Sequence, residues 1–120
     1  MSDIDEMIDR LTPRQRDEFA LACARRLVEK QLIISSSCID ALSTREKWLR
    51  GEATDQELES AARLAAWNAI SAASWSAVWA SVGWAQRAAM NAVAAVPMKD
   101  AERRWQRAEL ERMLKEGGGA

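Results

Sequence analysis

The chain has 120 residues, a formal net charge of −1, six tryptophans, two cysteines and no histidine. This length is enough for one domain with a hydrophobic core but not for two. The absence of histidine excludes the commonest general base, the Ser-His and Cys-His nucleophile pairs and most zinc sites. No stretch carries a run of like charges of the kind that binds nucleic acid or a membrane.

The cysteines and the N-terminal residues indicate a cytoplasmic protein. Cys23 and Cys38 are too few for a disulfide framework, so we expect two small buried apolar residues, with a single bridge between them as the alternative. The opening Met-Ser-Asp-Ile-Asp-Glu is acidic, unlike a secretory or organelle signal. No Gly-rich phosphate loop, CxxC pair or metal-ligand cluster occurs, so neither a cofactor nor a metal ion is expected.

The first quarter of the chain carries two helix starts. Ser2 and Asp5 are expected to cap a short first helix. Its apolar residues fall on one face: Ile4, Met7, Ile8 and Leu11. The run Thr12-Pro13-Arg14-Gln15 combines an N-cap, a proline at the first helical position and a capping-box glutamine, which predicts a helix over about residues 13–32. Its inward residues are expected to be Phe19, Ala22, Cys23 and Leu27.

Two further starts follow before residue 60. Ser37 and Asp40 form an S-x-x-D start, and Gly51 is a natural stop just beyond that helix. The buried stripe of this helix is expected to comprise Ile39, Leu42 and Leu49, with Trp48 beside it. Thr54 and Glu57 form another capping box, which opens an alanine-rich segment.

The alanine-rich segment, residues 55–96, is too long to be one helix of a compact domain. A continuous helix would extend about 63 Å, whereas a domain of this size has a radius of gyration of roughly 14 Å. One apolar face holds Leu58, Ala61, Ala62, Ala65 and Ala69. A second face, roughly 110° away, holds Trp75, Val78, Trp79, Val82, Gln86, Ala89, Met90 and Val93. The change of face predicts a break at Ser71–Ser74; Ser81–Gly83 is the second choice, and an unbroken helix in an elongated dimer is the third.

The remaining residues complete the predicted architecture. Asp100 is expected to cap a final charged helix that runs to about Lys115, and residues 117–120 are expected to form a disordered glycine-rich tail. The sequence therefore predicts an all-α fold over residues 1–116, a compact bundle of about five to six helices. Its centre would be an Ala/Trp-rich hairpin or long helix.

The 23 residues from Leu64 to Gln86 carry no charge and include four tryptophans. Polar side chains dilute this run, so a buried soluble helix is favoured over a membrane span. Alanine permits close helix packing, and the ladder Ala61, Ala65, Ala69 and Ala73 favours a helix seam within the chain or in a homodimer.

The tryptophans of this run divide into two groups. Trp75 and Trp79 lie on the apolar stripe and are expected in the core, whereas Trp67 and Trp84 lie off it and are candidates for an exposed patch or a dimer seam. Two arginines bracket the run and, with one amide, complete the candidate protein interface: Arg63, Arg87 and Asn68. The alternative for the two arginines is an ordinary solvated helix surface.

A basic stretch on the predicted second helix raises the possibility of DNA binding. It comprises Arg14, Arg16, Arg25, Arg26 and Lys30. The helix after Ser35–Ser37, however, lacks base-reading residues at its start, so helix-turn-helix recognition is disfavoured and a solvated face is the better interpretation.

Three segments resemble a known kind of helical module. They are Glu18–Arg26 (Glu-Phe-Ala-Leu-Ala-Cys-Ala-Arg-Arg), Trp48–Thr54 (Trp-Leu-Arg-Gly-Glu-Ala-Thr), and Glu57-Leu58 with Ala61-Ala62-Arg63 leading into the Ala/Trp repeat. The chain resembles, over roughly residues 12–95, an alanine-rich module of bacterial and phage proteins, many of them labelled immunity proteins. The resemblance implies an all-α bundle with a non-enzymatic binding role. Members often carry histidines in the alanine-rich part, which this chain lacks.

The leading functional hypothesis is a non-enzymatic inhibitor that neutralises a bacterial effector, such as a toxin, by occlusion. The first alternative is a phage-encoded anti-CRISPR or anti-defence inhibitor of a host nuclease complex; a net charge of −1 argues against mimicry of DNA. A small DNA-binding regulator is the further alternative. An enzyme would need an active site made of acids and arginines alone.

Overall fold

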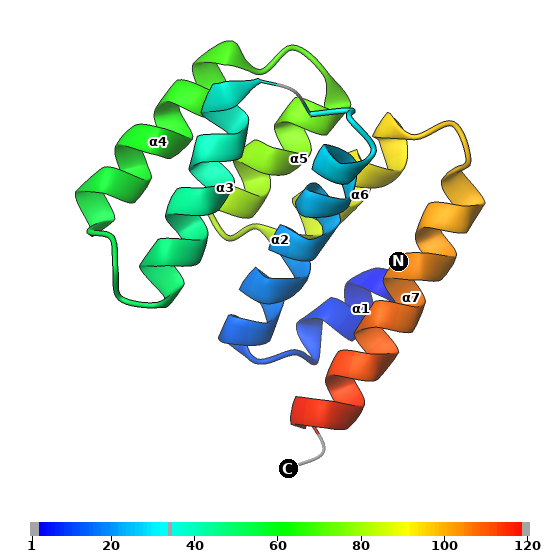
Figure 1. Ribbon diagram of the computed structural model, residues 1–120. Coiled ribbons are helices and arrows are strands. Elements are labelled where there is room, and N and C mark those ends of the chain that lie inside the picture. The colour runs from blue at the N-terminus through cyan, green and yellow to red at the C-terminus, as the bar shows by residue number, and fades with distance from the viewer. Residues whose placement is uncertain (1–2, 34, 119–120) are drawn as a thin grey trace.

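The computed structural model describes residues 3–33 and 35–118, in which seven α-helices alternate with short turns and no strand occurs. The helices are α1 Asp3–Asp9, α2 Pro13–Glu29, α3 Ser36–Leu49, α4 Asp55–Asn68, α5 Ala72–Ser81, α6 Ala85–Ala95 and α7 Lys99–Met113 (Figure 1). A π-helical turn, η1, continues α7 over Leu114–Gly118. The all-α prediction is confirmed. The helix count is seven rather than five to six, because the alanine-rich segment breaks twice.

Two of the predicted helix starts are confirmed as capping boxes. Thr12 Oγ1 accepts the Gln15 backbone N–H at 3.1 Å, and Gln15 Oε1 accepts the Thr12 N–H at 3.0 Å. Thr54 and Glu57 exchange the same two bonds at 3.0 and 2.9 Å. Each box satisfies two backbone donors that a helix N-terminus leaves unpaired.

Two other predicted starts are wrong. Helix α3 begins at Ser36 after the N-cap Ser35, so Ser37 lies inside the helix, with its hydroxyl 2.9 Å from that of Ser35. Helix α7 begins at Lys99, and Asp100 pairs with Arg103 within the first turn instead of capping the helix. Ser2, which was expected to cap α1, lies outside the described residues.

The end of α2 also differs from the prediction. The helix ends at Glu29 rather than Leu32, because Gln31 adopts a left-handed conformation with φ of 61°. The N–H of Leu32 then donates to the Leu27 carbonyl at 2.9 Å, and that of Gln31 to Val28 at 2.9 Å. This pair of bonds is a Schellman motif. Gly51, with φ of 75°, ends α3 as predicted.

The alanine-rich segment breaks at both of the sites considered. Helix α4 ends at Asn68, and the Ser71 hydroxyl accepts the Ser74 N–H to start α5. Helix α5 ends at Ser81, and Gly83, with φ of 83°, turns the chain into α6. The prediction of a single break, and the unbroken-helix alternative, are therefore wrong.

Helices α5 and α6 pack on each other through mostly small side chains. Their buried residues are Ala73, Ser74, Ser76, Ala77, Val78, Ala80 and Ser81 on α5, and Ala85, Ala88, Ala89, Ala92 and Val93 on α6. The Ser76 hydroxyl donates to the Ala88 carbonyl at 2.8 Å across this contact. Val82 and Met90, which were assigned to the buried stripe, are about half exposed. Val82 lies beyond the end of α5, and Met90 lies on α6, after the turn at Gly83.

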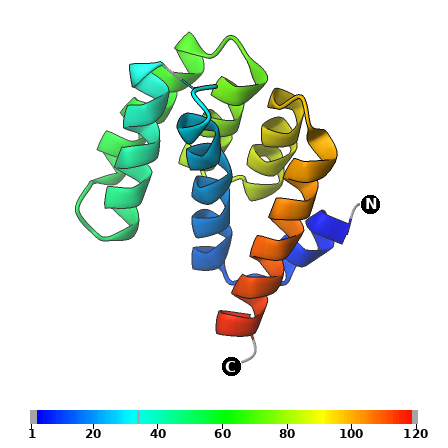
Figure 2. The same ribbon diagram turned by 45° about the vertical axis from the view of Figure 1, so that its right-hand side comes forward.

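Helix α2 is the central element, and it contacts α3, α5, α6 and α7. Its buried face carries Phe19, Ala20, Leu21, Cys23, Ala24 and Leu27; Ala22, predicted inward, is only partly buried. The α3–α4 pair lies on one side of the molecule and α7 on the other, with α1 beside α7 (Figures 1 and 2). The radius of gyration is 13.5 Å, close to the value expected for a compact domain.

Three further observations bear on the sequence predictions. Gly117 and Gly118 of the predicted tail belong to η1, and residues 119–120 lie outside the described residues. Across the part of the chain that the structure describes, no helix is both long and apolar enough to cross a membrane. Cys23 and Cys38 are both buried and free, so the predicted buried thiols are confirmed and the single disulfide is not formed.

Candidate protein-interaction surfaces

Among the residues that the structure describes, the two most exposed large apolar side chains lie at the C-terminal end of α4. Trp67 is 86% exposed and Ile70, in the connection to α5, is 94% exposed. Leu64, one helical turn before Trp67, is also more than half exposed. We call these three residues the α4 tip.

The local sequence explains why this tip faces solvent. Helix α4 buries Leu58, Ala62 and Ala65, and packs on α3 and α5. Trp67 follows Ala65 by two positions, about 200° around the helix, so it points away from the packed face. The tryptophan therefore has no neighbouring helix to cover it.

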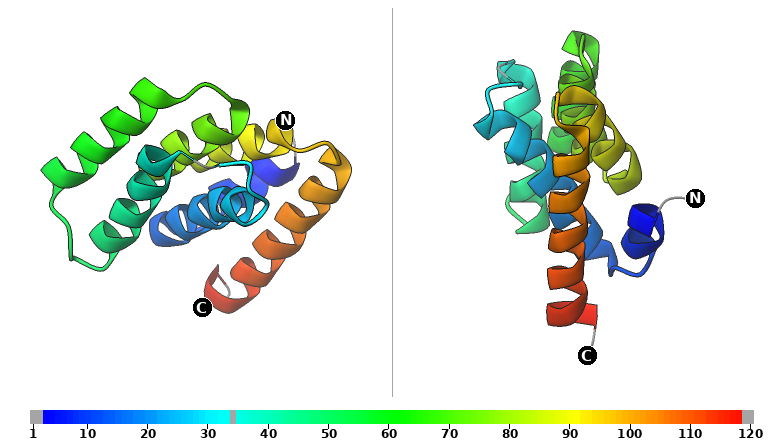
Figure 3. Two further views of the ribbon diagram at one scale, coloured as in Figure 1. Left: turned by 45° about the horizontal axis from the view of Figure 1, so that its top comes forward. Right: turned by 90° about the vertical axis from the view of Figure 1, so that its right-hand side faces the viewer.

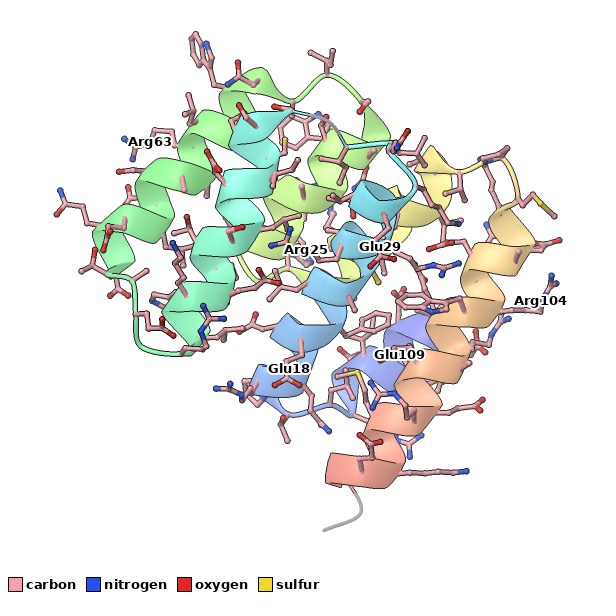
Figure 4. All side chains as sticks on the ribbon, in the orientation of Figure 1. Glu18, Arg25, Glu29, Arg63, Arg104 and Glu109 are labelled. Carbon is pink, nitrogen blue, oxygen red and sulfur yellow. The ribbon has the colours of Figure 1, made fainter. Side chains whose placement is uncertain are left out.

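Two residues assigned to the interface from the sequence flank the tip. Asn68 Nδ2 donates to the Ser37 hydroxyl at 3.2 Å and to the Leu64 carbonyl at 3.1 Å, which ties the end of α4 to the start of α3. Arg63 is exposed, forms an ion pair with Glu59 one turn earlier, and extends outward from α4 (Figure 4). Asn68 thus anchors the tip, and Arg63 lies at its edge.

Trp84 and Arg87, the other two predicted interface residues, lie apart from the tip at the start of α6. The Trp84 ring meets Trp79 edge to face, with centroids 5.2 Å apart, and Trp79 is 5.8 Å from Trp75. The Arg87 guanidinium lies 4.8 Å from the Trp84 ring and 5.5 Å from the Trp79 ring. Trp75 and Trp79 pack against the core as predicted, while Trp84 is 47% exposed.

Trp84 and Arg87 also line a groove of about 700 Å³ between α1, α6 and α7. Ile4, Ala89 and Val93 supply much of its apolar lining. At its edge Arg107 Nε donates to Asp3 Oδ2 at 2.7 Å, and this bond lowers the pKa of Asp3 and raises that of Arg107. The sequence alone does not reveal this groove, because α1 lies far from α6 and α7 in the chain.

The five predicted interface residues therefore form two separate sites. Helix α4, with the tip, and α7, which forms one wall of the groove, flank opposite sides of the molecule (Figures 1 and 3). Figure 4 accordingly shows Arg63 and Arg104 extending outward in opposite directions. Leu64 and Ile70, which complete the tip, were not predicted as interface residues. Their positions close to Trp67 and to the predicted break could have indicated them.

The basic stretch of α2 is largely paired within the molecule. Arg25 binds Glu46 of α3, and both Arg26 and Lys30 bind Glu102 of α7, at 3.0 and 3.2 Å. Arg14 pairs with the Glu18 carboxylate, and Arg16 donates to the carbonyls of Ile8 and Asp9. Apart from the Arg14–Glu18 pair, which lies within α2, these bonds cross-link helices.

Groups with chemical reactivity are few on the described surface. Within residues 3–33 and 35–118, no group of three or more Cys, Asp or Glu side chains is placed to hold a metal ion. Burial, followed by the nearby carboxylate of Glu102, raises the pKa of the Cys23 thiol well above its ordinary value. The thiol therefore stays protonated and is a poor nucleophile.

Comparisons of this chain with models of protein families, with curated proteins and with solved structures find no match. The resemblance to immunity-protein modules accordingly remains a prediction that rests on the three sequence segments quoted for it.

Proposed function

We propose that this protein is a non-enzymatic inhibitor that neutralises a bacterial protein by covering its working surface, with the α4 tip as the main contact. The observation that carries the proposal is the exposure of Trp67 and Ile70, three residues apart at the end of α4. Tryptophan is among the residues that contribute most to binding energy at protein interfaces. Large exposed apolar patches mark interaction sites on protein surfaces.

The structure around the tip favours occlusion by a preformed surface. Asn68 fixes the end of α4 against α3, and Ser71 starts the next helix three residues later, so the tip is held at both ends. A surface that is already ordered loses little conformational entropy on binding. Arg63, at the edge of the tip, supplies the polar rim that surrounds such contacts.

Two target classes fit this chemistry. One is a toxin, for which the protein would act as an immunity protein, and the other is a host nuclease complex, for which it would act as a phage-encoded anti-defence or anti-CRISPR inhibitor. DNA binding is less well supported, because the α2 cations already have partners within the protein. A homodimer through the alanine ladder is also less well supported, since Ala65 and Ala73 are buried within the chain.

The test uses the tagged protein as bait in bacterial lysates, followed by activity assays on the purified bound protein. We expect one equivalent of inhibitor to abolish the partner's activity, and Trp67→Ser to weaken binding at least tenfold. Met98→Ser is the matched control, because Met98 is another highly exposed apolar residue but lies outside the tip. Full activity of the partner in the saturated complex would contradict the proposal, as would equal binding by the Trp67 variant. Binding to duplex DNA that falls steeply with salt would favour the regulator instead.

A further inference from the structure

The groove between α1, α6 and α7 has a row of cations along its α7 wall. Lys99, Arg103 and Arg107 all line it, and they are spaced four residues apart. Residues at this spacing share one face of a helix and rise about 6 Å per step, so the row extends about 12 Å along the groove. Arg87 faces the groove from α6, on the opposite wall.

Several of these cations are available to an incoming carboxylate. Among the described residues Arg87 has no carboxylate within ion-pair distance, and it lies over the rings of Trp79 and Trp84. Lys99 Nζ donates to the Val96 carbonyl at 3.0 Å, at the C-terminal end of α6. Arg103 pairs with Asp100, whose carboxylate is 87% exposed. A partner carboxylate could therefore bind here without breaking a buried ion pair.

The lining between these cations is apolar. Met90 and Trp84 are each about half exposed at the mouth, and Ile4 and Val93 lie beneath them with little exposure. Burying the exposed parts of the methionine and the tryptophan against a partner removes apolar surface from water, which favours association. The groove thus combines an apolar lining with four cations on α6 and α7, while Asp3 and Asp5 line it from α1.

Helix α1 shows what kind of segment packs against α6 and α7 beside the groove. It carries four acids and no base, and two of its three apolar residues, Ile4 and Ile8, are buried at the i, i+4 spacing. Asp3 binds Arg107 of α7, and Asp9 accepts a hydrogen bond from the Gln86 side chain of α6 at 2.9 Å. A short acidic amphipathic helix is therefore already seated beside the groove.

We propose that the groove binds a second acidic amphipathic helix, supplied by a partner protein and lying beside α1. Its apolar face would contact Met90, Trp84 and Val93, and two acids four residues apart would pair with Lys99 and Arg103, while Arg107 keeps its bond to Asp3. This helix-binding site is separate from the α4 tip, so it goes beyond the proposed function and does not depend on it.

The probe for this site is a synthetic 16-residue helical peptide with leucines on one face and glutamates at every fourth position beside them. The control peptide has lysine in place of each glutamate. Titration into isotopically labelled protein, followed by nuclear magnetic resonance, should shift the amides of α1, α6 and α7 and the Trp84 indole N–H. The acidic peptide should bind at least tenfold more tightly than the lysine peptide, and binding should weaken as salt is raised.

Matched variants identify the residues involved. Arg103→Glu and Arg87→Glu should each weaken the acidic peptide at least tenfold, whereas Arg63→Glu, the same charge change on α4, should have no effect. Trp67→Ser should also bind the peptide normally, which separates this test from that of the α4 tip. Melting curves for each variant verify that the fold is retained.

Several outcomes would overturn the proposal. They are equal binding of the two peptides, shifts centred on α4, or a failure of both peptides to bind. A dimer in sedimentation that is lost in Arg103→Glu would assign the groove to a second copy of this chain. Shifts caused by decanoate, but not by the acidic peptide, would assign it to a small anionic amphiphile.

Discussion

The guanidinium of Arg45 lies directly beneath Gly83, so closely that a Cβ at residue 83 would be 2.7 Å from Arg45 Nη2. The same nitrogen donates to Asp17 Oδ1 at 2.7 Å, and the guanidinium carbon is 4.3 Å from the Trp48 ring centroid. Arg45 is largely buried, and thereby joins α2, α3 and the α5–α6 turn. Glycine at residue 83 meets two needs at once: a left-handed backbone and room for this side chain.

Replacement of Gly83 by alanine is expected to lower the free energy of unfolding by about 2–4 kcal/mol. A left-handed conformation costs an alanine about 1–2 kcal/mol, and the forced displacement of Arg45 adds about 1–2 kcal/mol more. Gly51→Ala is the matched control, because Gly51 has a similar φ of 75° but nothing within 4 Å of an added Cβ. Urea denaturation of both variants measures the difference. Equal losses would show that the close approach to Arg45 has no energetic consequence.

Removal of the Glu102 carboxylate is expected to destabilise the fold by about 2 kcal/mol, because a buried acceptor of charge-assisted hydrogen bonds is lost, while Arg26 and Lys30 are themselves partly exposed. Glu102 is only 1% exposed and receives hydrogen bonds from both Arg26 and Lys30. The neighbouring Asp100→Ala breaks an exposed pair instead and should cost less than about 1 kcal/mol. Thermal and chemical denaturation of Glu102→Ala and Asp100→Ala compare the two. Similar stabilities would mean that the link between α2 and α7 contributes nothing.

The tryptophans of α4 and α5 should differ sharply in their effect on stability. Trp67→Ala is expected to change the free energy of unfolding by less than about 0.5 kcal/mol, because the ring is solvated. Trp75→Ala is expected to cost about 2–3 kcal/mol, since that ring packs against the core and against Trp79. Circular dichroism during heating measures both variants. A large loss for Trp67 would place its ring in the core and remove the basis of the α4 tip.

The capping box of α4 should make stability depend on pH in the acid range. The Thr54 backbone N–H bonded to Glu57 lowers the pKa of that carboxyl below its ordinary value of 4.5. The folded state therefore binds this proton less readily than the unfolded chain does. The stabilisation is complete above about pH 4.5 and is lost as the pH falls through the lower folded-state pKa.

Glu57→Gln tests this pH dependence, because glutamine can make the same cap, as Gln15 does in α2. Its free energy of unfolding should fall less than that of the wild type between about pH 5 and pH 3. Asp3 contributes a loss of the same sign, since its pKa is also lowered, and Asp3→Asn serves as the parallel control. Identical pH profiles for Glu57→Gln and the wild type would contradict the assignment.

Both thiols should be unreactive in the native protein. Cys23 and Cys38 are fully buried, and burial raises the pKa of the Cys23 thiol, so little thiolate exists to attack a reagent. We expect an aromatic disulfide reagent to modify neither residue in buffer within minutes, and to modify two per chain in denaturant. Rapid modification of the folded protein would indicate an opening that exposes α2 or α3.

Local chemistry explains which parts of the fold were predictable from the sequence. The capping boxes at Thr12 and Thr54 are set by residues three apart, and the exposure of Trp67 follows from its angle to the packed face of α4. The start of α3 was misplaced because three serines in a row offer competing caps. The burial assigned to Met90 failed because a helical phase cannot be carried across the left-handed residue Gly83, and that assigned to Val82 failed because α5 ends one residue earlier, at Ser81.

Contacts between residues far apart in the chain could not be predicted from local sequence patterns. The groove requires α1, α6 and α7 to meet, and its Asp3–Arg107 pair joins residues 104 positions apart. The partnership of Glu102 with Arg26 and Lys30 likewise depends on how α7 packs on α2. The sequence predicted only that Arg26 and Lys30 belong to a solvated basic stretch and that Glu102 lies on a charged helix. Tertiary packing alone determines which of their charges meet.

The α5–α6 contact, made of methyl groups and hydroxyls, leaves the bulky indoles at its margins, and this has a spectroscopic consequence. Each candidate surface carries its own fluorophore, Trp67 at one and Trp84 at the other. Trp67 should emit at long wavelength and be readily quenched by iodide, whereas Trp84 is partly shielded by Trp79 and Arg87. The light emitted by the unlabelled protein can therefore report which of its two ends a partner has reached.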